Sequence, residues 1–303
     1  MQANLRPLSF GEILDGAFTL YRRNFASFAG TALASAAGLL VLAAVVGISV
    51  AVLIPYLMGS MVLMVLAALL ALTAIMAMVM LMWGALAWRA SQAYTGHATR
   101  LGESLAAGGR SAMKLVGVAV AAVLLTFAGL WVVVQAMEGA MFLLGSAGGP
   151  VVRVLLVVVA LAGMLGVPAV VMAALFATLP AVVLEEKGPV QAVSRSFSLV
   201  EGSLWRVAGV LLVALIITAL PGVAVLWASG GFEMLYDPAS AAVNAAMEPM
   251  SRQIVEQLLS WFVSVLTTPF LVSVIVLLYY DRRVRTEALD VRLAADRLAV
   301  AGD

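Results

Sequence analysis

Residues 5–25 read LRPLSFGEILDGAFTLYRRNF, and this stretch predicts an amphipathic helix that leads directly into a long apolar run. Ser9 and Glu12 have the spacing of a capping box, in which each side chain accepts a hydrogen bond from the other residue's backbone N–H. Hydrophobic residues then recur at helical spacing as far as Phe28. An apolar face followed by basic residues, here Arg22 and Arg23, is typical of a helix that lies on a membrane surface.

The composition is that of a membrane protein. Apolar residues make up 64% of the chain and charged residues only 11%, with a mean hydropathy of +1.11. Soluble domains are usually about 45–50% apolar and about 25% charged. The absence of cysteine excludes disulfides, thiol nucleophiles and thiolate metal sites. The formal net charge of +1 gives no sign of a nucleic-acid partner, and we expect none.

Six apolar runs are long enough to cross a bilayer, which takes about 20 residues. They cover approximately residues 31–54, 59–88, 115–134 (with a continuation toward 144 left open), 151–179, 204–226 and 254–280. We therefore predict an all-α fold: a polytopic membrane helix bundle with six transmembrane helices and amphipathic inner-surface helices, forming one integral membrane domain over residues 1–303. Asp237-Pro238 also predicts a short helix on the outer side.

The placement of basic residues predicts the orientation. If the N-terminus is inside, all of the 17 Lys and Arg residues except Arg153 and Arg252 fall on the inner side. Because cytoplasmic segments carry an excess of Lys and Arg, this bias predicts that both termini are cytoplasmic. The same outer segments hold Glu138 near Arg153, and we expect these two to form an interfacial ion pair.

The chain also shows signs of an internal repeat. Arg23, Lys114 and Arg206 recur at nearly equal intervals, each with an amphipathic stretch before it and an apolar run after it. A fixed internal period is the signature of a repeated structural unit. We predict a threefold repeat of a surface helix plus a two-span hairpin, with units of about 5–95, 96–187 and 188–285 and a cytoplasmic helical tail over 281–303.

Three segments carry a resemblance to a known family: residues 5–25, residues 188–207 and residues 277–290, the last of which reads LLYYDRRVRTEALD. They are similar to a bacterial family of multi-pass membrane proteins of poorly known function that includes the glycerophosphoryl diester phosphodiesterase membrane domain. The resemblance implies six spans with inner-surface helices in the bacterial cytoplasmic membrane. It does not imply the phosphodiesterase activity, because that enzyme is a separate barrel with paired histidines and this chain has only His97.

The candidate lipid- or partner-binding residues are charged positions at the predicted inner surface. They are Glu12, Asp15, Arg22, Arg23, Lys114, Arg195, Arg206, Asp281, Arg283 and Arg285. The simplest interpretation of Glu12 and Asp15 is that they cap the first helix and stabilise its dipole. The alternatives are a contact with a partner and a catalytic or metal-binding role. The basic residues serve either as topology anchors or as a site for anionic lipids, which attract each Lys or Arg by ~1 kcal/mol.

Away from their ends, the six apolar runs contain no Asp, Glu, Lys, Arg or His, although proton relays and ion pathways usually need such residues. We expect no enzyme activity, no cofactor and no metal site. The sequence favours a non-enzymatic membrane module that organises partner proteins or lipids at the cytoplasmic face. The alternative is a transporter or lipid translocator with an uncharged pathway, made flexible by Pro168, Pro221 and Pro269.

Overall fold

The computed structural model describes residues 6–57, 60–144, 149–228, 237 and 249–288, and all regular secondary structure in these ranges is helical. The helices are α1 (Phe10–Arg23), α2 (Phe25–Leu57), α3 (Met61–Thr95), α4 (Leu101–Leu144), α5 (Pro150–Ala174), α6 (Thr178–Leu184), α7 (Pro189–Val200), α8 (Leu204–Ala228) and α11 (Met250–Glu287). Six segments are long and apolar enough to cross a membrane: α2, α3, α4, α5 together with α6, α8 and α11. The predicted all-α fold with six apolar spans is confirmed.

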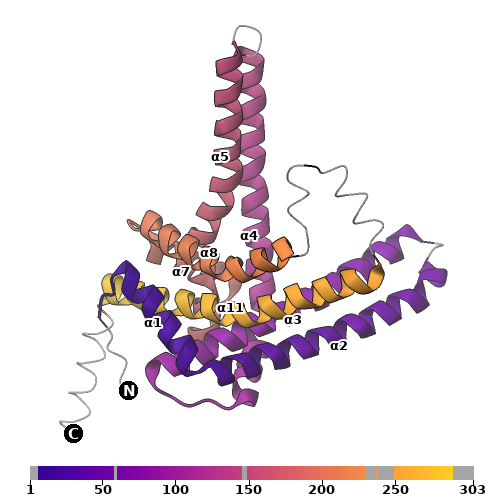
Figure 1. Ribbon diagram of the computed structural model, residues 1–303, viewed down its shortest axis with the longest axis vertical. Helices are drawn as coiled ribbons and strands as arrows, with labels where there is room; N and C mark the ends of the chain where they lie inside the picture. The colour runs from indigo at the N-terminus through magenta and orange to yellow at the C-terminus, as the bar shows by residue number, and fades with distance from the viewer. Residues whose placement is uncertain (1–5, 58–59, 145–148, 229–236, 238–248, 289–303) are drawn as a thin grey trace.

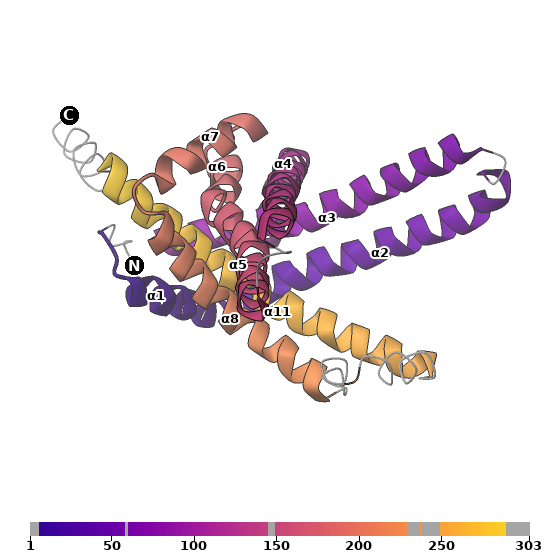
Figure 2. The same cartoon turned by 90° about the horizontal axis from the view of Figure 1, so that it is seen from above.

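The long helices form the pairs α2/α3, α4/α5 and α8/α11, which diverge from a common region (Figure 1, Figure 2). The short helices α1, α6 and α7 gather there around the C-terminal half of α11. We call this region the charged end, comprising residues 6–23, 89–114, 185–206 and 281–287. Buried side chains concentrate near it, whereas side chains far from it are bare: Met61 is 83% exposed and Phe142 86%. The hairpins are therefore joined at one end, and bilayer lipid must cover the other.

Helix α1 begins as the sequence predicts. Ser9 is its N-cap, and Ser9 and Glu12 form the reciprocal capping box. Its apolar face is divided, however. Ile13 and Ala17 are fully buried against α8 and α11, whereas Phe18 is 54% exposed and forms a T-shaped ring pair with Phe270. Helix α1 is thus docked on the bundle, and its exposed aromatic residues remain available to lipid.

The second predicted unit has no separate surface helix, because the amphipathic stretch after residue 101 continues into the span as helix α4. No proline interrupts α4. Gly108 lies where α4 packs closely against α3. A Cβ on Gly108 would lie 2.3 Å from the carbonyl oxygen of Leu81, and one on Gly84 would lie 3.1 Å from the Cα of Gly108. Small residues allow membrane helices to approach this closely. The structure contains the three helix pairs. That they are copies of one repeated unit stays a prediction.

The fourth span differs from the uninterrupted run in the sequence. Helix α5 continues through Pro168 and stops at Ala174, and α6 starts at Thr178. The interruption comes directly before Pro180, which lacks an N–H for the carbonyl of Phe176 and whose ring would clash with that carbonyl. Ser196 of α7 fills the gap: its hydroxyl donates to the Ala174 carbonyl at 2.6 Å and accepts from the Ala177 N–H at 3.1 Å.

Helix α11 continues the sixth span into the charged end, as predicted for the start of the tail, and ends at Glu287. The remaining tail lies outside the described residues, as does the predicted outer helix after Asp237-Pro238. The expected pair of Glu138 and Arg153 is not formed: within the described part of the chain, no ion pair joins these two exposed residues.

The two ends of α11 provide a test of topology. The helix has 38 residues, which at 1.5 Å each is about 57 Å, long enough to separate Ser251 from the charged end by a bilayer. Both Ser251 and Ser198 of α7 are exposed, and the chain has no native cysteine. Single cysteines at these two positions should react with a membrane-impermeant maleimide from opposite sides of sealed vesicles. Labelling of both from one side would contradict the spanning arrangement.

Candidate functional site

A buried carboxylate, Asp281 of α11, joins the two ends of the described chain. Its side chain is fully buried and accepts a hydrogen bond from the backbone N–H of Leu8 at 2.7 Å. The Arg285 Nε lies 2.9 Å from it and the Arg206 Nη2 3.4 Å. Both guanidinium groups also donate to the Leu8 carbonyl oxygen, at 2.5 Å from Arg206 and 2.6 Å from Arg285. Both backbone groups of Leu8, its N–H and its C=O, are therefore held; we refer to these two groups as the Leu8 peptide. We call this set of contacts the Asp281 clamp.

A second network lies around Glu185, directly after α6. Its carboxylate accepts hydrogen bonds from Arg195 of α7 at 3.0–3.2 Å and lies 2.9 Å from the Lys187 Nζ. The Tyr279 hydroxyl of α11 also donates to it. Arg195 bridges onward to Glu287, which in turn binds Arg283 at 3.1 Å. Arg283 lies 5.6 Å from the centre of the Tyr279 ring and completes the Glu185 network.

The Glu185 network determines the charge state of its members. Burial would raise the pKa of Glu185, but the hydrogen bonds from Tyr279, Arg195 and Lys187 outweigh it and hold that pKa at about 2. Burial would likewise lower the pKa of Arg195, but its hydrogen bonds to Glu287 and Glu185 raise it instead. Glu185 and Arg195 are therefore both ionised at neutral pH, as a structural lock between α6, α7 and α11 requires.

Other predicted residues serve local structure. The backbone N–H of Ser9 and the guanidinium of Arg6, 2.6 Å away, lower the pKa of Glu12 to about 2. Lys114 donates to the backbone carbonyl of Glu186 at 2.9 Å. Asp15 and Arg22 are exposed, and no described residue pairs with them. Arg23 is also exposed.

The structure thus divides the predicted set into three groups. Arg206, Asp281 and Arg285 form the clamp, and Arg195 with Arg283 belongs to the Glu185 network. The remaining residues lie outside both: Glu12, Asp15, Arg22, Arg23 and Lys114.

Sequence reasoning missed Glu185, Tyr279 and Glu287. Positions 279, 283 and 287 follow one another at four-residue intervals on α11, a spacing that places them on one helix face. This spacing was the available signal. Nothing in the sequence shows that Glu185, almost a hundred positions earlier, meets them.

Arg89 of α3 is a further buried charge. It is 4% exposed and donates to the Ser27 hydroxyl, whereas its Nε and Nη2 have no partner among the described residues. Ser27 lies near the start of α2, so Arg89 is at the charged end. The charged end therefore contains a buried guanidinium whose hydrogen bonds are incompletely satisfied among the described residues.

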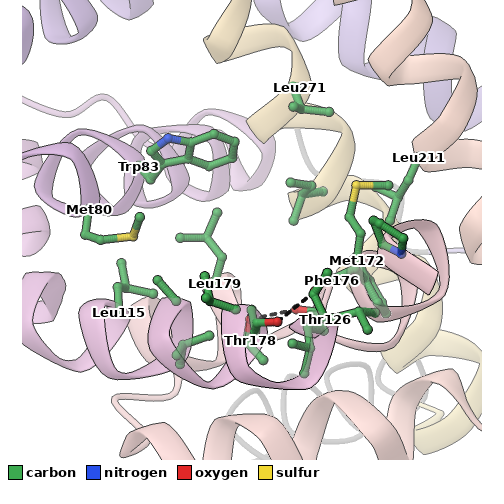
Figure 3. A pocket seen from close by; sticks show the side chains of 18 of the residues that line it. Met80, Trp83, Leu115, Thr126, Met172, Phe176, Thr178, Leu179, Leu211 and Leu271 are labelled. Carbon is green, nitrogen blue, oxygen red and sulfur yellow. Dashed lines mark hydrogen bonds between the residues drawn. The ribbon is translucent and has the colours of Figure 1, made fainter. Parts of the chain in front are cut away.

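A cavity of about 530 Å³ lies between the long helices (Figure 3). Ile275 of α11 lines it, one helical turn before Tyr279 of the Glu185 network. Residues of α3, α4, α5, α6, α8 and α11 line it, among them Met80, Trp83, Leu115 and Leu179, together with Phe176 from the turn between α5 and α6. The lining is almost entirely apolar. Metal ligands are a different matter: no group of three or more His, Asp or Glu within the described ranges is arranged to hold an ion.

Comparison of this chain with protein-family models, with curated proteins and with solved structures finds no match. Function must therefore be argued from the charged end and the cavity themselves.

The clamp predicts a large stability effect at Asp281. Asp281→Asn removes the charge that Arg206 and Arg285 share, and breaking a buried ion pair from one side typically costs about 3 kcal/mol or more. We expect the unfolding midpoint in detergent, followed by circular dichroism, to fall clearly. Asp15→Asn is the matched control, because this exposed carboxylate has no partner among the described residues, and the substitution should change stability by less than ~0.5 kcal/mol. Equal midpoints for the two variants would refute the clamp.

The Glu185 network predicts acid sensitivity. The folded pKa of Glu185 lies at about 2, below the value of 4.5 expected when it is unfolded. Between these values the unfolded chain binds more protons, so the stabilisation from Glu185 is present above pH 4.5 and is lost as the pH falls toward 2. Glu185→Gln should flatten the dependence of the unfolding free energy on pH in this window. The exposed Glu201→Gln is the control, and equal flattening by both would argue against the network.

Proposed function

We propose that this chain is a non-enzymatic integral membrane module that organises partner proteins or anionic lipids at its charged end. The observation that carries the proposal is the division of this end into a fixed interior and an exposed exterior. In the interior, Asp281 and Glu185 hold α1, α6, α7 and α11 together. On the exterior, Asp15, Arg22 and the ring of Phe18 are exposed.

The fixed interior suits binding, because it holds the backbone of α1 in place and so reduces the conformational freedom that is lost when a partner binds the exposed residues. The mixture of one acidic residue, one basic residue and an exposed aromatic ring on α1 also suits recognition of a protein at a membrane surface. Ion or proton transport usually relies on ionisable residues deep in the spans, and the six apolar runs contain none away from their ends.

The membrane and the orientation are part of the same proposal. The excess of Lys and Arg favours the charged end as the cytoplasmic one, with both termini on that side. The resemblance of residues 5–25, 188–207 and 277–290 to the glycerophosphoryl diester phosphodiesterase membrane domain family supports a bacterial inner membrane location.

Charge exchange on α1 tests the proposal. Arg195 and Arg206 are unsuitable positions, since they hold the fold together. Asp15→Lys combined with Arg22→Glu reverses the exposed pattern at constant net charge. We expect recovery of the proteins or anionic lipids that bind at α1, measured by mass spectrometry after native purification, to fall about tenfold, the effect of losing ~1.4 kcal/mol of binding energy.

The control exchanges charges at the opposite end. Arg252 and Glu256 form an ion pair at 3.0 Å, so Arg252→Glu combined with Glu256→Arg also keeps the net charge. This variant should retain every partner. If the α1 exchange folds and keeps all its partners as well, the charged exterior is not a docking surface.

The cavity gives the alternative a specific basis. A transporter or lipid translocator with an uncharged pathway would use the apolar space between the diverging helices, whose lining includes Pro168. Liposomes containing the purified chain would then show flux of a labelled phospholipid above that of empty liposomes, with no dependence on a proton gradient. Equal flux in both kinds of liposome would eliminate this alternative.

A further inference from the structure

The cavity between the diverging helices offers few polar groups to a ligand. Its polar groups are the indole N–H of Trp83 and the hydroxyls of Thr126 and Thr178, which donate to the backbone carbonyls of Ala122 and Leu175 at 2.8 and 2.6 Å (Figure 3). Ordered water needs two to four polar partners, so water is a poor occupant. A space of about 530 Å³ lies within the usual range of ligand sites, about 300–1,000 Å³. The chemistry of the lining therefore selects hydrocarbon.

The mouth of the cavity faces the bilayer. Val123 and Phe127 of α4 belong to the lining and are 51% and 68% exposed. Both lie in the apolar part of a membrane-crossing helix, where an exposed side chain contacts lipid tails. The hydrocarbon at hand is therefore an acyl chain of a membrane lipid.

A smaller, polar crevice of about 110 Å³ lies between α3, α4 and the end of α6. Arg110, Ser111 and Lys114 of α4 line it, with Glu186 on the opposite side. The backbone of Glu186 has a φ of +54°, and its carbonyl accepts the hydrogen bond from Lys114. Arg110 is exposed, and no described residue pairs with its guanidinium. Two cations facing one carboxylate leave the crevice with a positive excess that suits a phosphate.

The crevice and the cavity are neighbours along the same helices. On α4, Lys114 lines the crevice and Leu115 the cavity. On α6, Val182 lines the crevice and Leu179, about one turn away, lines the cavity. In a glycerophospholipid only the glycerol unit separates the phosphate from the acyl chains, so one molecule fits this order of a cationic site followed by an apolar one.

We propose that the chain binds one anionic glycerophospholipid, with its phosphate at Arg110 and Lys114 and one acyl chain in the cavity between α3, α4, α5, α6, α8 and α11. This inference deepens the lipid part of the proposed function and rests on it. It assigns the lipid to a site away from the exposed residues of α1.

Lipid retention tests the proposal with the full chain. The wild-type protein, exchanged extensively into detergent, should keep one phosphatidylglycerol per chain in native mass spectrometry. When lipid is added back, phosphatidylglycerol should bind more tightly than phosphatidylcholine, whose phosphate is neutralised by choline, and diacylglycerol, which has no phosphate, should bind weakest. Equal binding of all three would overturn the phosphate site.

Two kinds of variant separate the head and the chain of the lipid. Arg110→Gln with Lys114→Gln removes the cations, and Ala122→Phe places a ring in the cavity, which Ala122 lines. Each should weaken phosphatidylglycerol binding about tenfold. Ala128→Phe is the matched control, because Ala128 is an exposed residue of the same helix outside the cavity lining. Unchanged affinity in the first two variants would overturn the proposal.

A fluorescence measurement decides the matter if Ala122→Phe does not fold. Trp83 lines the cavity, and bromine on an acyl chain quenches tryptophan on contact. Brominated phosphatidylglycerol, titrated into phosphatidylcholine micelles, should give a saturable quenching component that Trp83→Phe abolishes. Non-saturable quenching would show general lipid contact and overturn the site. Failure here is distinguishable from failure of the proposed function, since the exchange at Asp15 and Arg22 should lose partners but keep this lipid.

Discussion

The buried carboxylate of Asp281 is the interaction on which the charged end depends. Membrane helices gain no hydrophobic driving force from packing together, because lipid tails are as apolar as leucine. Close contacts and polar bonds must hold them instead. Asp281 binds the Leu8 peptide and two arginines with a fully buried side chain, and so it fastens the N-terminal segment to α8 and α11 at once.

The remaining contacts follow the same physical logic. Gly84 and Gly108 let α3 and α4 cross so closely that a methyl group at either position would collide with the other helix. Ser196 satisfies backbone groups that the break between α5 and α6 would otherwise leave open within the apolar region. Unsatisfied backbone groups are costly in the bilayer, so a broken span is stable only where another element supplies the missing bonds. Helix α7 therefore both seals the break and carries Arg195 to Glu185.

Much of the fold was predictable from the sequence because its causes are local. Span length, the capping box at Ser9 and the basic bias of one end depend on residues close together in the chain. The break before Pro180 was also local, but it was hidden by the apolar run around it. Arg206, Asp281 and Arg285 were identified as candidates without their shared partner, the Leu8 peptide. The pairing of Glu185 with Tyr279 depends on how distant helices pack, and neither period nor composition encodes that directly.

The distribution of polar groups limits what the molecule can do. Ionisable residues lie near the ends of the spans, and many of those at the charged end form bonds that hold helices together. A carboxylate that must stay ionised to maintain a lock is poorly placed to shuttle protons, because each protonation would loosen the structure around it. The apolar cavity lies beside this lock, and Phe176 and Leu179 link its lining to the broken span. Hydrocarbon in the cavity would extend the packing of α5 and α6 into a region that protein side chains leave unfilled, so the lock and the cavity favour binding and structural organisation over ion-coupled transport.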